Sequence, residues 1–255
     1  MTGIYPPIDR EYPEAMSTFA HPIADPTTGK LPRFRRWIPL SLKMFVAMLG
    51  ILGVIAGYCG MQIYRQHAAI QEIERLGGQV SSLPTGPNWL RGMLFVQRQR
   101  LFHDVIGVRL NDTPADDATL ARLACLTKVQ ELSLVNTQVT DAGLVHLKCM
   151  TGLRHLNLGK TRVTNAGMVH LKGFTNLERL LLDVTQVTDE GLVHLSGFSK
   201  LIILWLTGTQ VTDAGLQHLE KLSSLLELQL LHSQVTDDGL AEFKRSMPGL
   251  KYAYR

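Results

Sequence analysis

The stretch LSLVNTQVTDAGL, residues 132–144, decides the fold because it returns along the chain at a constant interval. Its hexapeptide VTDAGL recurs with small changes in five copies, which begin at Val139, Val163, Val187, Val211 and Val235. A degenerate copy precedes them, with Val108, Leu110, Thr113, Asp117, Leu120 and Leu123 in phase. A constant period of this kind predicts a solenoid, in which each coil packs only on its neighbours.

The residues of the repeat predict one short strand and one short helix in each coil. Successive side chains of a strand point to opposite faces, so Leu132 and Leu134 face inward and the residue between them faces outward. Thr137 suits a turn, since its hydroxyl can bond nearby backbone groups. Thr140 suits a helix N-cap, which places Asp141 in the favourable first turn. We therefore expect a helix of about two turns with its apolar face inward.

A glycine stands in this predicted helix in every clear copy, at Gly143, Gly167, Gly191, Gly215 and Gly239. Glycine costs about 1 kcal/mol relative to alanine in a helix interior, so its return predicts close packing against the neighbouring coil. Stacked strands lie about 4.8 Å apart, whereas packed helices need about 8–10 Å. The stack is therefore expected to bend, with the strands on the concave side.

The full unit, L-x-x-L-x-L-x-x-T-x-V-T-D-x-G-L-x-x-L, resembles the repeat of the leucine-rich-repeat family over about residues 105–255. Threonine, or serine at Ser233, stands where the family usually has asparagine. The resemblance implies an α/β leucine-rich-repeat solenoid with parallel strands inside and short helices outside. It does not identify a ligand. With the segments before it, the chain resembles bacterial membrane-anchored leucine-rich-repeat proteins.

Both ends of such a solenoid need caps. Residues 66–104 are the predicted juxtamembrane segment and N-terminal cap, with a helix from about His67 to Leu76 that ends at Gly77 and Gly78. Residues 247–255 are predicted to form a closing strand. Its core-covering residues are expected to be Leu250, Tyr252 and Tyr254.

The apolar run from Met44 to Tyr64 carries no charge. As a helix it would span about 30 Å, the thickness of the hydrocarbon core of a bilayer. We predict a single transmembrane helix within residues 37–65. The alternative, a cleaved signal peptide, fits less well because the apolar run is long and begins only at Met44.

The charges that flank this segment predict its orientation. Five basic residues precede it without an acid after Asp25: Lys30, Arg33, Arg35, Arg36 and Lys43. This bias predicts a signal anchor with a cytosolic N-terminus and with the repeats on the periplasmic or extracellular side of the cytoplasmic membrane. Residues 1–36 contain six prolines and no apolar periodicity, so we expect a disordered cytosolic arm.

A GxxxG motif lies within the apolar segment, at Gly53 and Gly57. Small residues at this spacing allow two membrane helices to approach closely, which predicts a homodimer. The alternative interpretation is that glycine is common in membrane helices.

No catalytic, cofactor-binding or metal-binding constellation is found in the sequence, and no basic-aromatic pattern indicates nucleic-acid binding. One histidine recurs in each coil (His146, His170, His194 and His218), at a spacing too wide for one zinc ion. Cys125 and Cys149 share a phase in adjacent coils, and whether they pair is left open.

The predicted outward strand positions contain one apolar group, formed by Leu181, Ile203, Trp205 and Leu231 and flanked by Arg179 and Asp183. A contiguous apolar patch centred on tryptophan often marks a protein interface. The alternative is that another part of the chain folds over it, or that it has no role.

Together these features predict a non-enzymatic, membrane-tethered module that binds a protein partner on its concave face. Two alternatives of other classes remain. One is an adaptor of an enzyme complex, of the ligase type. The other is a structural membrane protein that oligomerises through Gly53 and Gly57.

Overall fold

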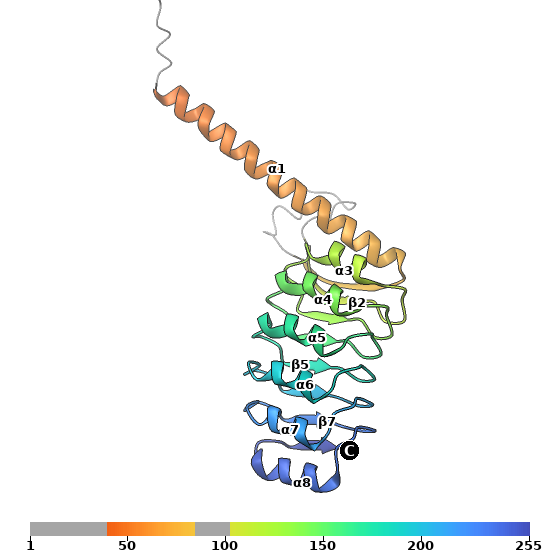
Figure 1. The fold of residues 1–255 in the computed structure, drawn as a ribbon. Coiled ribbons are helices and arrows are strands. Elements are labelled where there is room, and N and C mark those ends of the chain that lie inside the picture. Colours follow the sequence, from red (N-terminus) through yellow and green to blue (C-terminus); the bar gives the residue numbers. More distant parts are fainter. Residues whose placement is uncertain (1–39, 85–102) are drawn as a thin grey trace, which may run out of the picture. The chain divides into compact units, whose positions relative to one another are not determined.

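The computed structural model describes residues 40–84 and 103–255, so the predicted disordered arm lies outside the described residues. The described chain begins with the helix α1 (Leu40–Arg75) and the strand β1 (Gln79–Pro84). From there strands and short helices alternate to the end of the chain (Figure 1). The strands are β2 (His103–Arg109), β3 (Glu131–Ser133), β4 (His155–Asn157), β5 (Arg179–Leu181), β6 (Ile203–Trp205), β7 (Glu227–Gln229) and β8 (Tyr252–Tyr254). The α-helices are α3 (Asp117–Leu123), α4 (Asp141–Leu144), α5 (Asn165–Met168), α6 (Asp189–Leu192), α7 (Asp213–Leu219) and α8 (Asp237–Ser246).

All of these strands belong to one sheet, in chain order. β1 pairs antiparallel with β2, and every later pair is parallel. Leu132 aligns with Leu156, and Leu156 aligns with Leu180, so one coil repeats directly above the last. This parallel stacking of equal coils confirms the predicted leucine-rich-repeat-like solenoid.

The apolar positions of the repeat form one continuous core between the strands and the helices. In the coil that begins with β3, the following side chains are at most 2% exposed: Leu132, Leu134, Val139, Leu144, Leu147, Met150 and Leu153. The same positions are buried in the next coils, which is why a single repeat could not be stable without its neighbours.

The expected helix of about two turns is present in α3 and α7, with seven residues each, and α8 is longer at ten residues, whereas the three helices between α3 and α7 are shorter. α4, α5 and α6 are each only about one turn long, and the chain continues as a 3₁₀ helix in η2 (Val145–Cys149), η3 (Val169–Gly173) and η4 (Val193–Leu195). The tighter 3₁₀ winding is common at the ends of short α-helices.

The first threonine of each repeat has the predicted turn role. The Thr137 hydroxyl is buried and donates a 2.7 Å hydrogen bond to the carbonyl oxygen of Leu134. Equivalent bonds of 2.6–2.7 Å are made by Thr113, Thr161, Thr185 and Thr209. These bonds satisfy a hydroxyl inside the core, where an unpaired one would be costly.

The acidic residue of four of the repeats joins two coils, a role that the sequence did not reveal. Asp141 Oδ1 accepts a 2.8 Å bond from the Thr164 backbone N–H, and its Oδ2 accepts a 2.7 Å bond from the Thr164 hydroxyl. The same pair of bonds links Asp117 to Thr140, Asp189 to Thr212 and Asp213 to Thr236. We call this row the Asp–Thr ladder.

One position of the ladder is an asparagine. Asn165 Oδ1 accepts from the Thr188 N–H at 2.9 Å, and its Nδ2 donates to the Thr188 hydroxyl at 2.8 Å. The hydroxyl of Thr188 makes no capping bond to α6, whereas Thr164 caps α5 by accepting from the backbone N–H of Ala166. Asparagine therefore preserves the joint between coils and changes which groups the threonine bonds.

The recurring glycines leave room for this ladder. A Cβ at Gly215 would lie 2.2 Å from Asp189 Oδ1, and one at Gly167 would lie 2.3 Å from Asp141 Oδ1. The predicted close packing is therefore present, and the neighbour is the carboxylate of the preceding coil.

α1 supplies the predicted N-terminal cap through Ala69, Ile70 and Ile73, which are buried against the first coil. Gly77, at φ +83°, ends the helix as predicted. The Gly78 N–H bonds the carbonyl of Ile73 and the Gly77 N–H bonds that of Glu74, as in a Schellman C-cap. The expected membrane helix and cap helix are, however, one continuous element.

The closing strand is present, but the expected roles of its tyrosines are wrong. Tyr252 aligns with Glu227, and this interval is one residue longer than that between Ile203 and Glu227, the aligned pair before it. A shift of one residue exchanges the two faces of a strand. Ala253 therefore faces the core beside Leu250, while Tyr252 and Tyr254 point outward and are 54% and 48% exposed.

Candidate binding surface

The side chains that point away from the core along β2–β8 form a surface that we call the strand face. Two parallel rows of aligned residues run along it. The first row is Gly107, Glu131, His155, Arg179, Ile203, Glu227 and Tyr252, and the second is Arg109, Ser133, Asn157, Leu181, Trp205, Gln229 and Tyr254. The strand face is thus polar from β2 to β4 and rich in apolar groups from β5 to β8.

The apolar residues selected from the sequence lie on this face, except for Leu231, which follows the end of β7. Leu181, Ile203, Trp205 and Leu231 are each half-buried, and Leu181 aligns with Trp205 on the neighbouring strand. Leu204 and Leu206, on either side of Trp205, are fully buried, so the indole points outward as predicted. The Trp205 Nε1–H donates a 2.9 Å hydrogen bond to Glu227 Oε1. That bond fixes the indole at its polar edge.

The sequence missed the two tyrosines of β8 as part of this face. Tyr254 lies two strands from Trp205 in the same row, and Tyr252 lies two strands from Ile203. Only the longer interval between β7 and β8 reveals their direction, and no signal in the repeat itself indicates it.

Of the two polar residues selected with the patch, Asp183 is held by its own chain. Asp183 Oδ1 accepts a 2.9 Å bond from the Thr207 backbone N–H. Burial raises the pKa of Asp183 above its ordinary value, against the opposing effect of the bond from Thr207. Arg179, in contrast, is exposed, and its guanidinium has no hydrogen-bonding or ionic partner among the described residues.

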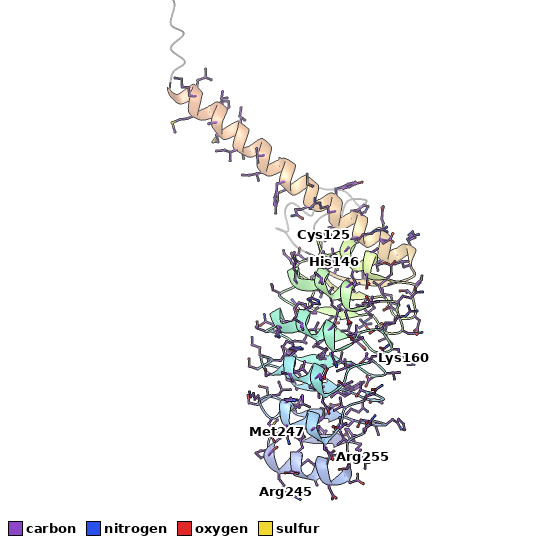
Figure 2. All side chains as sticks on the ribbon, in the orientation of Figure 1. Cys125, His146, Lys160, Arg245, Met247 and Arg255 are labelled. Atoms are coloured by element: carbon purple, nitrogen blue, oxygen red, sulfur yellow. The ribbon has the colours of Figure 1, made fainter. Side chains whose placement is uncertain are left out.

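A left-handed backbone conformation recurs at the turn after each strand from β2 to β7. Positive φ angles of 54–66° are found at Asp112, Asn136, Lys160, Val184, Gly208 and His232. Lys160, at this turn, projects on the side away from the short helices (Figure 2). Val184 is the unusual member, because a β-branched side chain is strained at positive φ, and its side chain is 52% exposed. The strain lies beside Asp183, in the coil that carries Leu181.

A hollow of about 180 Å³ lies on the polar half of the strand face. The outward residues that line it are Arg109, Glu131, Ser133, His155, Asn157, Arg179 and Leu181. Like Arg179, the exposed guanidinium of Arg109 has no partner among residues 40–84 and 103–255.

α1 is long and apolar enough to cross a membrane by length and composition, over Leu42–Arg75. Its side chains from residue 42 to residue 62 are exposed, and they radiate from the helix on all sides (Figure 2). A Cβ at Gly53 or Gly57 would meet nothing within 4 Å, so the described chain leaves the GxxxG positions open.

In the part of the chain that the structure describes, no group of three or more histidine, cysteine, aspartate or glutamate side chains could hold a metal ion. Cys59, Cys125 and Cys149 are free thiols. Burial raises the pKa of the Cys125 thiol, which is half-buried and lies 3.4 Å from the carbonyl oxygen of Arg122.

No family model matches the sequence, and no curated protein matches it either. Among solved structures, an internalin (inlF) from Listeria monocytogenes is 26% identical with a TM-score of 0.43, covering 52% of this chain and 36% of its own. Internalin C2 from the same organism is 25% identical with a TM-score of 0.43, and the match covers 61% of this chain and 73% of internalin C2. A leucine-rich-repeat protein from Leptospira interrogans is 20% identical with a TM-score of 0.42, and the match covers 56% of this chain and 34% of that protein. The chain thus spans about a third of two of these proteins.

Overlaps with TM-scores this low carry no argument, so the class of the protein is defined by its own geometry. Parallel strands at a constant interval, inward leucines and short helices on the other side define a leucine-rich-repeat-like solenoid.

Proposed function

We propose that this chain is a membrane-anchored, non-catalytic binding protein whose strand face holds a protein partner outside the cytoplasm. The observation that carries the proposal is the apolar group around Trp205, on the outward side of β5 and β6. Tryptophan and tyrosine are enriched among the residues that dominate protein interfaces. The exposed tyrosines of β8 extend the same surface and support the proposal further.

The anchor of the proposal is the apolar part of α1. A hollow lined by Tyr58 and Gln62 on α1 also contains Asp104 and Lys128, whose side chains form a 2.6 Å ion pair. An ion pair is unfavourable in hydrocarbon, so we infer that the embedded part of the helix ends before Tyr58. Residues 40–57 would then rise about 27 Å at about 1.5 Å per residue, close to the thickness of the hydrocarbon core. Lys43 lies in the first turn of this segment, where its long side chain can extend to the polar interface.

The proposed orientation rests on the basic residues before α1, which favour a cytosolic N-terminus. Cys149 offers a direct test because its thiol is exposed on the solenoid. A membrane-impermeant maleimide should label Cys149 in intact cells, and Cys149→Ser should remove that signal. Labelling only after the cells are permeabilised would reverse the orientation.

The binding role is tested by a photo-reactive benzoylphenylalanine in the full chain. Placed at Leu231, two residues after the Gln229 that aligns with Trp205, it should crosslink one protein partner; placed at Val169, exposed on the helical side, it should not. Trp205→Ala should abolish the Leu231 product, since loss of a central anchor typically costs about 2 kcal/mol or more of binding free energy. An unchanged melting temperature separates this result from misfolding. Equal products at both positions would refute the proposed surface.

A further inference from the structure

The charges of the strand face are unevenly satisfied. Three carboxylates between β3 and β7 on or beside this face already have a partner from the chain. Glu178 Oε1 lies 3.0 Å from Arg154 Nη1. Glu227 accepts from the Trp205 indole and Asp183 accepts from the Thr207 N–H, both at 2.9 Å. A fourth, Glu131, has its Oε1 3.4 Å from His155 Nδ1, a contact that is an ion pair only when the imidazole is protonated. The guanidinium groups of Arg109 and Arg179 have no such partner among the described residues.

The two unpaired guanidinium groups line one hollow of about 180 Å³. Arg109 lies on β2 and Arg179 on β5, three strand spacings of about 4.8 Å away, and Arg179 aligns with Gly107, two residues before Arg109. Their backbones are therefore about 16 Å apart. Arginine side chains are long enough for both to reach a group held between β3 and β4. Asn157, whose side-chain amide can donate a further hydrogen bond, lines the same hollow. An arginine fork can bind the two oxygens of a carboxylate with two parallel hydrogen bonds, and a carboxylate is the acidic group that an unmodified protein side chain supplies.

We propose that the hollow binds a carboxylate side chain of an extended segment of the partner, and that the next anchor of that segment is an apolar side chain on Trp205. The inference rests on the proposed binding function of the strand face. It adds the chemistry of the partner, which would place an acidic side chain over β3 and β4 and an aliphatic or aromatic side chain over β6.

The geometry also fixes the spacing of the two anchors. From the middle of β3 and β4 to β6 is two and a half strand spacings, or about 12 Å. An extended chain rises about 3.3 Å per residue, and its alternate side chains point to the same side. Residues i and i+4 of the partner lie about 13 Å apart on one side and satisfy both conditions. The expected motif is therefore an acidic residue four positions from a large apolar residue.

The test uses the full chain in lipid nanodiscs and a phage-displayed library of random decapeptides, depleted first on empty nanodiscs. Selected peptides should be enriched at least about tenfold in an Asp or Glu four positions from an aromatic or aliphatic residue, the size expected for one charge-assisted anchor. The double variant Arg109→Gln/Arg179→Gln should lose the acidic preference and keep the apolar one. Trp205→Ala should do the opposite, and Arg245→Gln, on α8, should change neither.

The outcomes separate the two proposals. Peptides that compete for Trp205 but show no acidic preference would overturn the carboxylate site and leave the binding surface standing. An acidic preference that survives the double variant would overturn the site as well. If the selection yields no peptide sensitive to Trp205→Ala, the inference and the proposed surface both fail. Melting temperatures of the variants exclude unfolding as a cause, because Arg109 and Arg179 are exposed and make no side-chain bonds within the described chain.

Discussion

The helical side and the strand face of the solenoid come from the same repeats but use their polar residues differently. On the helical side, the bonds from Thr164 to Asp141 return one coil later from Thr188 to Asn165. On the strand face, Ser133, Asn157, Leu181 and Trp205 occupy the same position in successive coils and share no chemistry. On the helical side the same side-chain contacts recur in successive coils, whereas on the strand face only the backbone recurs.

The difference follows from what each position must satisfy. A partly buried Thr164 N–H needs an acceptor, and the preceding coil supplies it. An outward side chain of a strand meets solvent, so the fold imposes no residue type there. Variation in the outward rows is therefore free to follow a partner, while variation in the ladder is restricted by stability.

The largest effect is expected where a side chain enters the ladder. In Gly215→Leu the new Cβ would lie 2.2 Å from Asp189 Oδ1, which itself bonds Thr212. Overpacking and the displaced hydrogen bonds should lower the free energy of unfolding by about 3 kcal/mol. Urea denaturation followed by circular dichroism measures this. Gly173→Leu is the control, since its Cβ would meet nothing within 4 Å. Equal losses in both variants would show that the ladder does not require glycine.

Removal of a ladder carboxylate should have the next largest effect. Asp141→Ala leaves the N–H and the hydroxyl of Thr164 without their acceptors, which should cost about 2 kcal/mol. Asp238→Ala is the matched control, because Asp238 is exposed in the first turn of α8 and has no side-chain partner among the described residues. Its cost should stay within about 0.5 kcal/mol, as for most surface substitutions. A similar cost for both variants would mean that these aspartates only stabilise the first turn of their own helix and do not join two coils.

A smaller effect of opposite sign is expected at the turn beside the apolar patch. Val184→Gly should raise the free energy of unfolding by about 1 kcal/mol, because it relieves a β-branched residue at φ 54°. Lys160→Gly, at φ 54° in the preceding coil, should gain less because lysine is not β-branched. Thermal melts of the two variants and the parent chain measure the two gains in stability. A lowered melting temperature for Val184→Gly would mean that its side chain stabilises the fold through contacts with the next coil.

The smallest effects are expected from two carboxylates on opposite sides of the solenoid. The Thr236 hydroxyl and N–H lower the pKa of Asp213, with a further contribution from the charge of Arg255. Its contribution to stability is therefore present above the ordinary pKa and is lost as the pH falls through the lowered one. Asp213→Asn should be less stable than the parent chain at neutral pH, and the two should converge in acid.

Asp183 should show the reverse dependence, since burial raises its pKa. The protonated form is favoured in the folded state, so stability is highest below the ordinary pKa and falls as the pH rises through the raised one. Asp183→Asn keeps an acceptor for the Thr207 N–H and should be the more stable chain at neutral pH. Melting curves between about pH 3 and pH 8 measure both pairs, across the range in which carboxylates titrate. Parallel curves for the Asp183 and Asp213 variants would contradict the contrast between the two sides.

Much of this architecture could be predicted from the sequence. The constant interval of the repeat requires stacked coils, and the alternation of side chains along a strand requires Trp205 to point outward between Leu204 and Leu206. The same reasoning placed Thr137 in a turn and ended the cap helix at Gly77, since both depend on the residue and its near neighbours. Local stereochemistry determines features of this kind, and the sequence contains it in full.

Tertiary structure decided what depends on the coil above or below. The reason for glycine at Gly215 is a carboxylate of the preceding coil, at Asp189. The left-handed turn imposes one backbone angle on lysine, valine and glycine alike, which no residue preference would indicate. The outward direction of Tyr252 depends on a coil that is one residue longer than the one before it. Arg109 and Arg179 are far apart in the chain, and they share one hollow because the sheet stacks their strands three spacings apart. Contacts between coils depend on the register and the spacing of the strands in three dimensions. Where a coil departs from the repeat, the sequence pattern alone determines neither of them.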